Sequence, residues 1–334
     1  MPSFSRTQRE VIARTRLLRI LSSHGIANWR TLEQKISDAG PSPQRIDPHI
    51  LTPVRRQLEK EGLISRRNES GTPWYYLSEA PKPLIEERLS LQLPVWQAIQ
   101  ADNLKKRVGQ SLELAIYRAL LFQDALPDYL GAFLDLNDHD DSTLYSKEEP
   151  PRRLGKRTMD GRLDFLVRHP DAGWAGIEAK NIREWMYPDR DEIFQLLSKC
   201  FQLNAVPVLI ARRIHFSTFA VLNACGVVIH QTFNQFFPES ETKLADQARH
   251  KHNLGYHDIR PRNTPDARLS RFVSTDLPKV LPEHRARFET HQDIIGAYVA
   301  SEMSYREFAA RVRRRRLGQN EDHDWEDSDD RPEY

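Results

Sequence analysis

The stretch GRLDFLVRHPDAGWAGIEAKN, residues 161–181, determines the fold expected for most of this chain. From Leu163 to Val167 every second residue is a large apolar one, which is the period-two pattern of a β-strand. Residues 169–173 contain a proline, an aspartate and a glycine, which indicate a turn. Residues 174–181 then have the character of a second short strand. The stretch therefore predicts two adjacent antiparallel strands.

The same alternation assigns each side chain of this hairpin to a face. In the second strand Ile177 and Ala179 point one way, whereas Glu178 and Lys180 point the other. Asp164, on the first strand, falls on the face of the charged pair. The sequence therefore predicts one aspartate beside a glutamate–lysine pair on a single face of a sheet.

The segments around the hairpin complete a domain. A long helix is expected upstream, at about residues 104–123. Downstream, DEIFQLLSKCFQL (residues 191–203) has the spacing of an amphipathic helix, and VPVLIAR (residues 206–212) has the character of a buried strand. We therefore expect an α/β domain, α+β over the whole chain, in which helices flank a mixed sheet.

These residues and this order of elements resemble the PD-(D/E)XK nuclease superfamily, whose fold is restriction-endonuclease-like. The matching positions are Asp164, the triplet 178–180 (Glu-Ala-Lys) and the helix residue Glu113 in GQSLE. The resemblance covers about residues 105–232. It departs from the family pattern where Arg162-Leu163 replaces the proline that gives the motif its name.

The resemblance implies a Mg²⁺ site in which Mn²⁺ can substitute. Its ligands would be the side chains of Asp164, Glu178 and Glu113 and the carbonyl of Ala179. It also implies that Gln195, on the following helix, lies near the phosphate of the substrate, and Gln202 is a rival for that place. The same positions thus serve as the expected catalytic and metal-binding residues.

The expected chemistry explains these residue types. A phosphodiester resists attack because its anionic oxygens repel a nucleophile. Asp164 and Glu178 offer the oxygen ligands that Mg²⁺ prefers, and the ion would polarise the phosphate and acidify a water. Lys180, on the face of Glu178, would orient that water and stabilise the developing negative charge.

A structural alternative exists for each of these residues. Asp164, Glu178 and Lys180 could form a surface cross-strand charge cluster, which contributes little to stability. Their place within strongly apolar strands argues against it, because buried charges are costly unless they bind something. Glu113, alone on a helix, could simply be solvated.

The first eighty residues have the pattern of a winged helix. Three helices are expected, at about residues 11–24, 29–39 and 47–61, followed by two strands around a polar turn at residues 68–71. In this fold the third helix normally enters the DNA major groove and the hairpin, or wing, meets the backbone. The residues expected to contact DNA are Arg55, Arg56, Arg66 and Arg67. The alternative is that the winged helix binds protein.

Composition excludes several classes of protein. The two cysteines, Cys200 and Cys225, exclude a disulfide scaffold and a cysteine-built zinc site, and they fit a reducing cytoplasm. No apolar run is long enough for a transmembrane helix, and the N-terminus lacks the apolar core of a secretory signal. His250, His252 and His257 are expected on a polar surface or near DNA phosphates; a zinc site with Asp258 is the weaker alternative.

Charge is unevenly distributed along a chain whose net charge is only +2. An arginine-rich run at residues 311–316 precedes residues 321–334, where eight acids and one arginine give −7. The expected organisation is a winged-helix domain at 1–80, a linker helix at 81–103, a nuclease domain at 104–260, a C-terminal helical extension at 261–318 and a disordered acidic tail at 319–334.

Together these features predict a metal-dependent DNA endonuclease, recruited to DNA by its winged helix, in prokaryotic defence or restriction. Two alternatives stay open: a non-catalytic DNA-binding regulator, and a structure-specific repair nuclease. One active site cuts one strand, so cleavage of both strands would require a homodimer or a partner protein of a defence system. No membrane partner is expected.

Overall fold

The computed structural model describes residues 5–38, 46–137 and 139–321. The chain divides into two compact units. Within the described residues, the first unit contains residues 5–105 and 241–259, and the second contains residues 106–240 and 260–321. The expected acidic tail lies outside the described residues from 322 onward.

The first unit begins with helices and short strands in alternation. Its elements are α1 (Arg6–His24), β1 (Ile26–Asn28), α2 (Trp29–Ile36), α3 (Pro48–Lys60), β2 (Ile64–Glu69), β3 (Thr72–Leu77), α4 (Lys82–Gln100) and α8 (Thr242–Arg249). The side chain of Ser5 caps α1 by accepting from the amide of Gln8, and Gly25, with a φ of 78°, ends it. The three expected helices and the hairpin are thus present near their predicted positions.

The sheet of the first unit is antiparallel, with the strand order β1-β3-β2. Strands β2 and β3 are joined by Ser70 and Gly71, both with positive φ, which matches the right-handed twist of a two-residue hairpin. The apolar faces of α1, α2 and α3 pack together with Ile64 and Tyr75 in one core. The hairpin is therefore fixed to the helices through buried side chains.

Two features of the first unit differ from the sequence-based expectation. Helix α4 continues through Pro94, although a proline within a helical segment predicts an interruption there. Residues 241–259, expected in the second domain, belong to the first unit: His24 Nε2 lies 2.7 Å from the carbonyl of Asn253, and Lys35 donates to the carbonyl of Lys251. The sequence could not predict this, because no local pattern marks a late segment that packs against the start of the chain.

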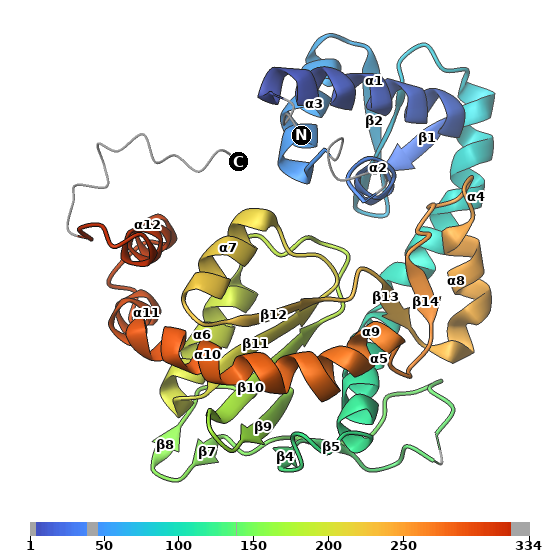
Figure 1. Cartoon of the computed structure of the whole chain (residues 1–334). Helices are drawn as coiled ribbons and strands as arrows, with labels where there is room; N and C mark the ends of the chain where they lie inside the picture. The colour runs from blue at the N-terminus through green and yellow to red at the C-terminus, as the bar shows by residue number, and fades with distance from the viewer. Residues whose placement is uncertain (1–4, 39–45, 138, 322–334) are drawn as a thin grey trace. The chain divides into compact units, whose positions relative to one another are not determined.

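A mixed five-stranded sheet forms the centre of the second unit, with the order β12-β11-β10-β9-β4 (Figure 1). Its strands are β4 (Tyr129–Leu130), β9 (Phe165–His169), β10 (Gly173–Lys180), β11 (Val206–Ala211) and β12 (Val228–Gln231). Strands β9 and β10 are antiparallel, with Ile177 opposite Phe165, whereas β10, β11 and β12 are parallel. The predicted hairpin at residues 161–181 and the mixed sheet are confirmed.

Helices cover both faces of this sheet. One face packs against α5 (Asp102–Leu121), α9 (Ala267–Arg271) and the first part of α10 (Leu277–Thr290). The other packs against α6 (Asp191–Leu203), α7 (Phe216–Ala224), α11 (Gln292–Val299) and α12 (Tyr305–Arg316). A π-helical segment, η3 (Phe272–Asp276), joins α9 to α10. The mixed α/β architecture expected from the sequence is therefore present.

The smaller elements of the second unit lie in its connections. They are β5 (Ala132–Phe133), β6 (Lys147–Glu148), β7 (Arg153–Leu154), β8 (Arg157–Thr158), β13 (Gln235–Phe237), η2 (Glu239–Glu241) and β14 (Ile259–Pro261). The C-terminal segment was expected to hold one closing helix at about residues 294–312. It forms α11 and α12 instead, because Ser301 takes a φ of 61° and Ser304 caps the new helix by accepting from the amide of Glu307.

Candidate functional site

Asp164 precedes β9 directly and is fixed to β10 by two hydrogen bonds. Its amide donates to the carbonyl of Ile177 at 3.0 Å, and its Oδ2 accepts from the amide of Ala179 at 2.7 Å. The carboxylate therefore bridges the two strands where their backbone pairing ends. The N–H and C=O of one strand residue point to the same edge, so the carbonyl of Ala179 also lies on the side of Asp164.

Glu178 is the most enclosed charged residue of the hairpin, with only 6% of its surface exposed. Lys180 Nζ lies 2.7 Å from its Oε1, and Lys199 Nζ lies 3.3 Å from its Oε2. Burial raises the pKa of Glu178 above its usual range, and repulsion by Asp164 adds to this, although both lysines counteract it. Asp164, Glu178 and Lys180 thus lie together, and a solvated surface cluster does not describe Glu178.

Lys199 was not among the residues singled out from the sequence. It lies on α6, one helical turn beyond Gln195, and its side chain is 11% exposed. Helix α6 approaches β10 closely at Gly176, where a Cβ would lie 2.9 Å from Cys200 Sγ and closer still to Leu163. One signal in the sequence could have identified Lys199: it lies next to the buried stripe of an amphipathic helix, and that helix faces the site.

The two glutamines expected near the phosphate have different environments. Gln195 is exposed on α6. Gln202 is used within the fold: its amide nitrogen donates to Asp160 Oδ2 at 2.9 Å, and its oxygen accepts from the amide of Asp160 at 2.7 Å. On this helix, Lys199 is the residue that contacts the carboxylate of Glu178.

Glu113 reaches the site from α5, on the other face of the sheet, and is bound by Lys147. The Nζ of Lys147 lies 2.6 Å from Glu113 Oε2 and 3.6 Å from Asp164 Oδ1. Burial raises the pKa of Glu113 to about 7, with a further contribution from the charge of Asp164 and an opposing one from Lys147. Glu113 is therefore not a solvated helix residue, and the negative charge of Asp164 acts on its carboxyl group.

The proline-rich, basic composition of residues 147–157 predicts a surface loop, but the position of Lys147 differs from that prediction. Its side chain is 8% exposed, and Nζ lies 5.0 Å from the centroid of the Phe165 ring and 5.8 Å from that of Phe133. The segment does carry exposed arginines, but β6 pairs with β5 and turns Lys147 inward. The proline-rich, basic composition concealed one inward-facing residue.

The oxygen donors of the site fit a hard divalent cation. Mg²⁺ takes carboxylate and carbonyl oxygens, which Asp164, Glu178, Glu113 and Ala179 provide. The three carboxylates do not form a group whose ligand atoms all lie within 4.8 Å of one another. Lysine ammonium groups lie against each of them: Lys147 against Glu113 and Asp164, and Lys180 and Lys199 against Glu178. Opposite charges within about 4–6 Å favour the ionised form of each partner.

The chain stands apart in comparisons with known proteins. No protein-family model, curated protein or solved structure matches it. The candidate site therefore rests on the geometry of the chain's own residues.

The four arginines expected to contact DNA have different environments in the first unit. Arg55 is 12% exposed, bonds Glu59 and the hydroxyl of Tyr75 at 2.7 Å each, and stacks on the Trp29 and Tyr75 rings. Its guanidinium is thus part of the packing between α3 and the hairpin. This environment favours a structural role for Arg55 over direct contact with DNA.

The other three arginines are closer to the surface. Arg67 lies between Glu69 at 2.5 Å and Glu86 at 2.6 Å, which balance its charge. Arg56 is exposed on α3, and Arg66 is 61% exposed on β2. Arg56 and Arg66 are therefore the most exposed members of the set, and Arg66 Nε lies 3.6 Å from Glu59 Oε1.

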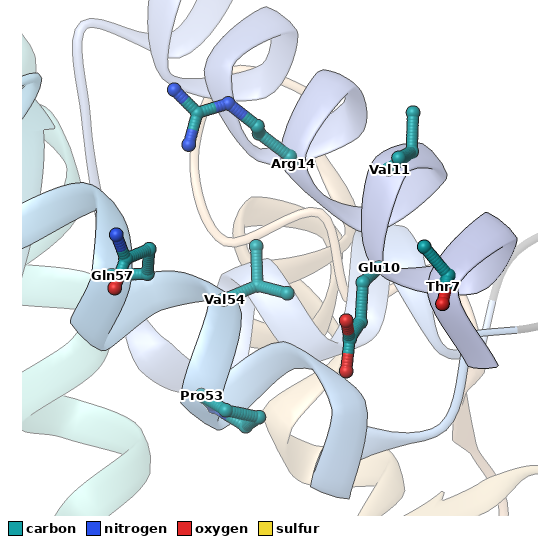
Figure 2. A pocket seen from close by; sticks show the side chains of 7 residues that line it. All are labelled: Thr7, Glu10, Val11, Arg14, Pro53, Val54 and Gln57. Atoms are coloured by element: carbon teal, nitrogen blue, oxygen red, sulfur yellow. The ribbon is translucent and has the colours of Figure 1, made fainter.

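A shallow pocket of about 340 Å³ lies between α1 and α3 (Figure 2). Its lining residues are Thr7, Glu10, Val11, Arg14, Pro53, Val54 and Gln57. Arg14 pairs with Glu61 at 2.6 Å, so the polar rim is already engaged within the fold. The pocket contains none of the residues singled out from the sequence.

The remaining expectations concern the histidines and the cysteines. His250 and His252 have their ring centroids 5.5 Å apart, but within the described residues no cluster of metal-ligating atoms includes them. Cys200 and Cys225 are buried, and burial raises the pKa of both thiols, so neither is an activated nucleophile. Among the described helices, none has the length and apolar character that a membrane span requires.

Proposed function

We propose that this chain is a metal-dependent DNA endonuclease that hydrolyses phosphodiester bonds. One observation carries the proposal: Glu178, buried in β10, interacts with Asp164, the residue directly before β9, and contacts Lys180 from its own strand. A buried carboxylate is costly to desolvate even when lysines pair with it, and a site that binds a cation and a phosphate gives it a purpose.

The proposal includes the finer fold assignments. The second unit would be restriction-endonuclease-like, supported by the order helix α5, hairpin β9–β10, helix α6 and parallel strand β11 around the site. The first unit would be a winged helix, supported by three helices and the hairpin β2–β3. Both assignments agree with a nuclease that recruits its DNA through a separate unit.

In the proposed reaction, Asp164, Glu178, the Ala179 carbonyl and Glu113 would hold Mg²⁺ or Mn²⁺. When bound, the ion supplies positive charge that polarises the scissile phosphate and favours ionisation of the attacking water. Lys180 would orient that water through its ammonium and stabilise the negative charge that develops on the phosphate oxygens.

Lysine is suited to this role because it stays charged. Burial lowers the pKa of Lys180, but the attraction of Glu178 and the hydrogen bond between them outweigh that effect and raise it. Lys199 donates to the second oxygen of the same carboxylate and holds Glu178 in place. The site thus combines carboxylates that bind the ion with ammonium groups that face the phosphate.

The biological setting follows from the architecture and is part of the proposal. A DNA-recruiting unit joined to a nuclease suits a cytoplasmic enzyme of prokaryotic defence or restriction. Since one site cuts one strand, cleavage of both strands would require a second copy of this chain or a partner protein.

The decisive experiment is a cleavage assay with purified protein on plasmid, linear duplex, flap, junction and single-stranded DNA. Activity is expected with Mg²⁺ or Mn²⁺ and not with EDTA. Asp164→Asn, Glu178→Gln and Lys180→Met should each reduce cleavage by at least a hundredfold, a typical effect of removing a metal ligand or a transition-state donor. Glu148→Gln, an exposed residue of β6, is the matched control.

The outcomes separate the competing functions. Undiminished cleavage by the Asp164→Asn, Glu178→Gln double variant would overturn the site. DNA binding without cleavage on every substrate would favour a regulator, and activity restricted to flaps or junctions would favour a repair nuclease.

A further inference from the structure

The side chain of Lys147 lies among the carboxylates on one side of the candidate site. Its Nζ lies 2.6 Å from Glu113 Oε2 on α5, 3.6 Å from Asp164 Oδ1 and 3.7 Å from Glu149 Oε2. The centroids of two phenylalanine rings lie 5.0 and 5.8 Å from the same atom. One cation is thus held between side chains from separate segments of the chain.

This ammonium group is buried and remains charged. The side chain of Lys147 is 8% exposed. Burial lowers the pKa of Lys147, but the attraction of Glu113 and Asp164 outweighs that effect and raises it. Buried ion pairs contribute little net stability, because desolvating the two charges costs about as much as their attraction returns. Stability of the fold is therefore a weak reason for an ammonium at this place.

The carboxylates of the site are too widely spaced to share one ion in the arrangement that the structure shows. Two oxygens bound to the same Mg²⁺ lie at most about 4.2 Å apart, which is twice the metal–oxygen distance. Among the described residues, Glu113, Asp164 and Glu178 do not form a group whose ligand atoms all lie within 4.8 Å of one another. Their spacing is that of a site for two cations.

Asp164 lies between the two cation positions. Its Oδ1 is the oxygen near Lys147, whereas its Oδ2 points to β10 and accepts from the amide of Ala179. The position on the Glu113 side of Asp164 is therefore already filled by an ammonium group. The position on the β10 side has Glu178 and the carbonyl of Ala179 as its further oxygen donors.

We propose that the ammonium of Lys147 takes the place of a second metal ion, so that the candidate active site binds a single Mg²⁺ or Mn²⁺. Sites that hold two ions place them about 3.5–4 Å apart, and the pair offsets negative charge on both the attacking and the leaving oxygen. Lys147 supplies one of these positive charges from the chain itself, with Asp164 between it and the ion.

This inference rests on the proposed nuclease function and narrows its ligand set. Glu113 pairs with Lys147 instead of binding the ion, and the ion is left with Asp164, Glu178 and the carbonyl of Ala179. The other coordination positions go to water and to oxygens of the substrate, which Mg²⁺ usually retains in enzyme sites.

Counting the Mn²⁺ ions that the full chain binds without DNA tests the inference. Free Mn²⁺ is measured by electron paramagnetic resonance, and the binding of the Asp164→Asn, Glu178→Gln double variant is subtracted. The subtraction removes ions held elsewhere, for example by the acids of residues 321–334. The wild type should bind one ion per chain and Lys147→Met two, whereas Lys156→Met, which replaces an exposed lysine of the same loop, should bind one.

Glu113→Gln provides a measurement that does not require the Lys147 variant to fold. It should lower Mn²⁺ affinity by less than about tenfold, whereas Asp164→Asn, which removes a ligand, should lower it by at least about tenfold. Glu113→Gln combined with Lys147→Met removes both partners of the pair and should bind one ion again. Thermal unfolding of each variant confirms that the fold is retained.

Ion counts and cleavage are scored separately, so the two proposals can fail independently. Two ions in the wild type, one ion in a folded Lys147→Met, or an affinity loss in Glu113→Gln as large as that in Asp164→Asn would overturn the role of Lys147, whether or not the protein cleaves DNA. One ion in the wild type and two in Lys147→Met, without cleavage of any substrate, would support Lys147 and overturn the nuclease. A wild type that binds no Mn²⁺ at the site would overturn both.

Discussion

At the scale of single residues, the raised pKa of Glu113 leads to a prediction about stability and pH. Its pKa of about 7 lies above the usual range of a glutamate because the side chain is buried and faces Asp164. A carboxyl whose pKa is higher in the folded state binds more protons there, so folding stability falls as pH rises from about 4.5 to 7.

We therefore expect Glu113→Gln to flatten the decline of unfolding free energy with pH in this window. The difference should be about 1–3 kcal/mol between its two ends, because one pKa unit corresponds to about 1.4 kcal/mol and the group is partly screened. Urea unfolding in EDTA from pH 4.5 to 7.5 measures it, with exposed Glu148→Gln as the control. Parallel curves for wild type and Glu113→Gln would show that Glu113 ionises normally.

Lys147 provides the second prediction at this scale. Its ammonium is enclosed between Glu113 and Asp164, so Lys147→Met leaves two carboxylates facing each other with less compensating charge. Loss of one partner of a buried pair costs about 3–5 kcal/mol.

Added Mn²⁺ should restore more stability to Lys147→Met than to the wild type, because the ion takes over the neutralising charge. Thermal unfolding with and without Mn²⁺ compares the two, and Lys156→Met, an exposed lysine of the same loop, is the control. An equal Mn²⁺ effect in all three proteins would contradict a metal site at these carboxylates.

At the scale of elements, the sequence predicted what depends on local periodicity. The hairpin 161–181 was predictable because alternation fixes both its strands and the face of Glu178, and a parallel strand at 206–211 is almost entirely apolar. Lys147 was not predictable, since only the tertiary fold turns it toward the carboxylates, whereas the amphipathic pattern of α6 offered a signal for Lys199. The division between α11 and α12 was missed because Ser301 and Ser304 resemble ordinary helix-surface residues.

The elements of the first unit also separate four arginines that looked equivalent in the sequence. Arg55 packs between aromatic rings, and Arg67 pairs with two carboxylates at 2.5 and 2.6 Å. Arg56 is exposed, and Arg66, 61% exposed, lies farther from its carboxylate, 3.6 Å from Glu59. A charge that is already balanced within the fold releases fewer counterions when DNA binds.

We expect Arg56→Gln with Arg66→Gln to weaken DNA binding and to reduce its salt slope by about 1.8, at about 0.9 per contact. Arg55→Gln should instead destabilise the first unit, seen as a lower unfolding midpoint in urea, with a smaller change in slope. Unchanged DNA affinity in the Arg56, Arg66 variant would indicate that this unit binds protein.

At the scale of the whole molecule, the charge asymmetry of the C-terminus becomes important. Arg315, in the arginine-rich run, pairs with Asp293 at 2.6 Å and with Glu321 at 2.5 Å, and Glu321 is the first acid of the acidic terminal segment. That segment, residues 321–334, carries a net charge of −7. Its first residue thus contacts one arginine of the arginine-rich run.

An acidic segment that binds basic surfaces competes with DNA phosphates for them. Deleting residues 321–334 should therefore tighten DNA binding, most strongly at low salt, with the gain fading as screening shortens the range of the interaction from about 30 Å at 0.01 M to about 8 Å at 0.15 M. The measurement is DNA affinity of the truncated and full-length chains across a salt series. Arg315→Gln in the full-length chain separates the local pair from the total charge, because it frees Glu321 and leaves the rest of the segment intact. If the segment only aids solubility, the truncated and full-length chains will bind DNA equally at the lowest salt. That result would mean that the −7 charge of the segment does not compete with DNA.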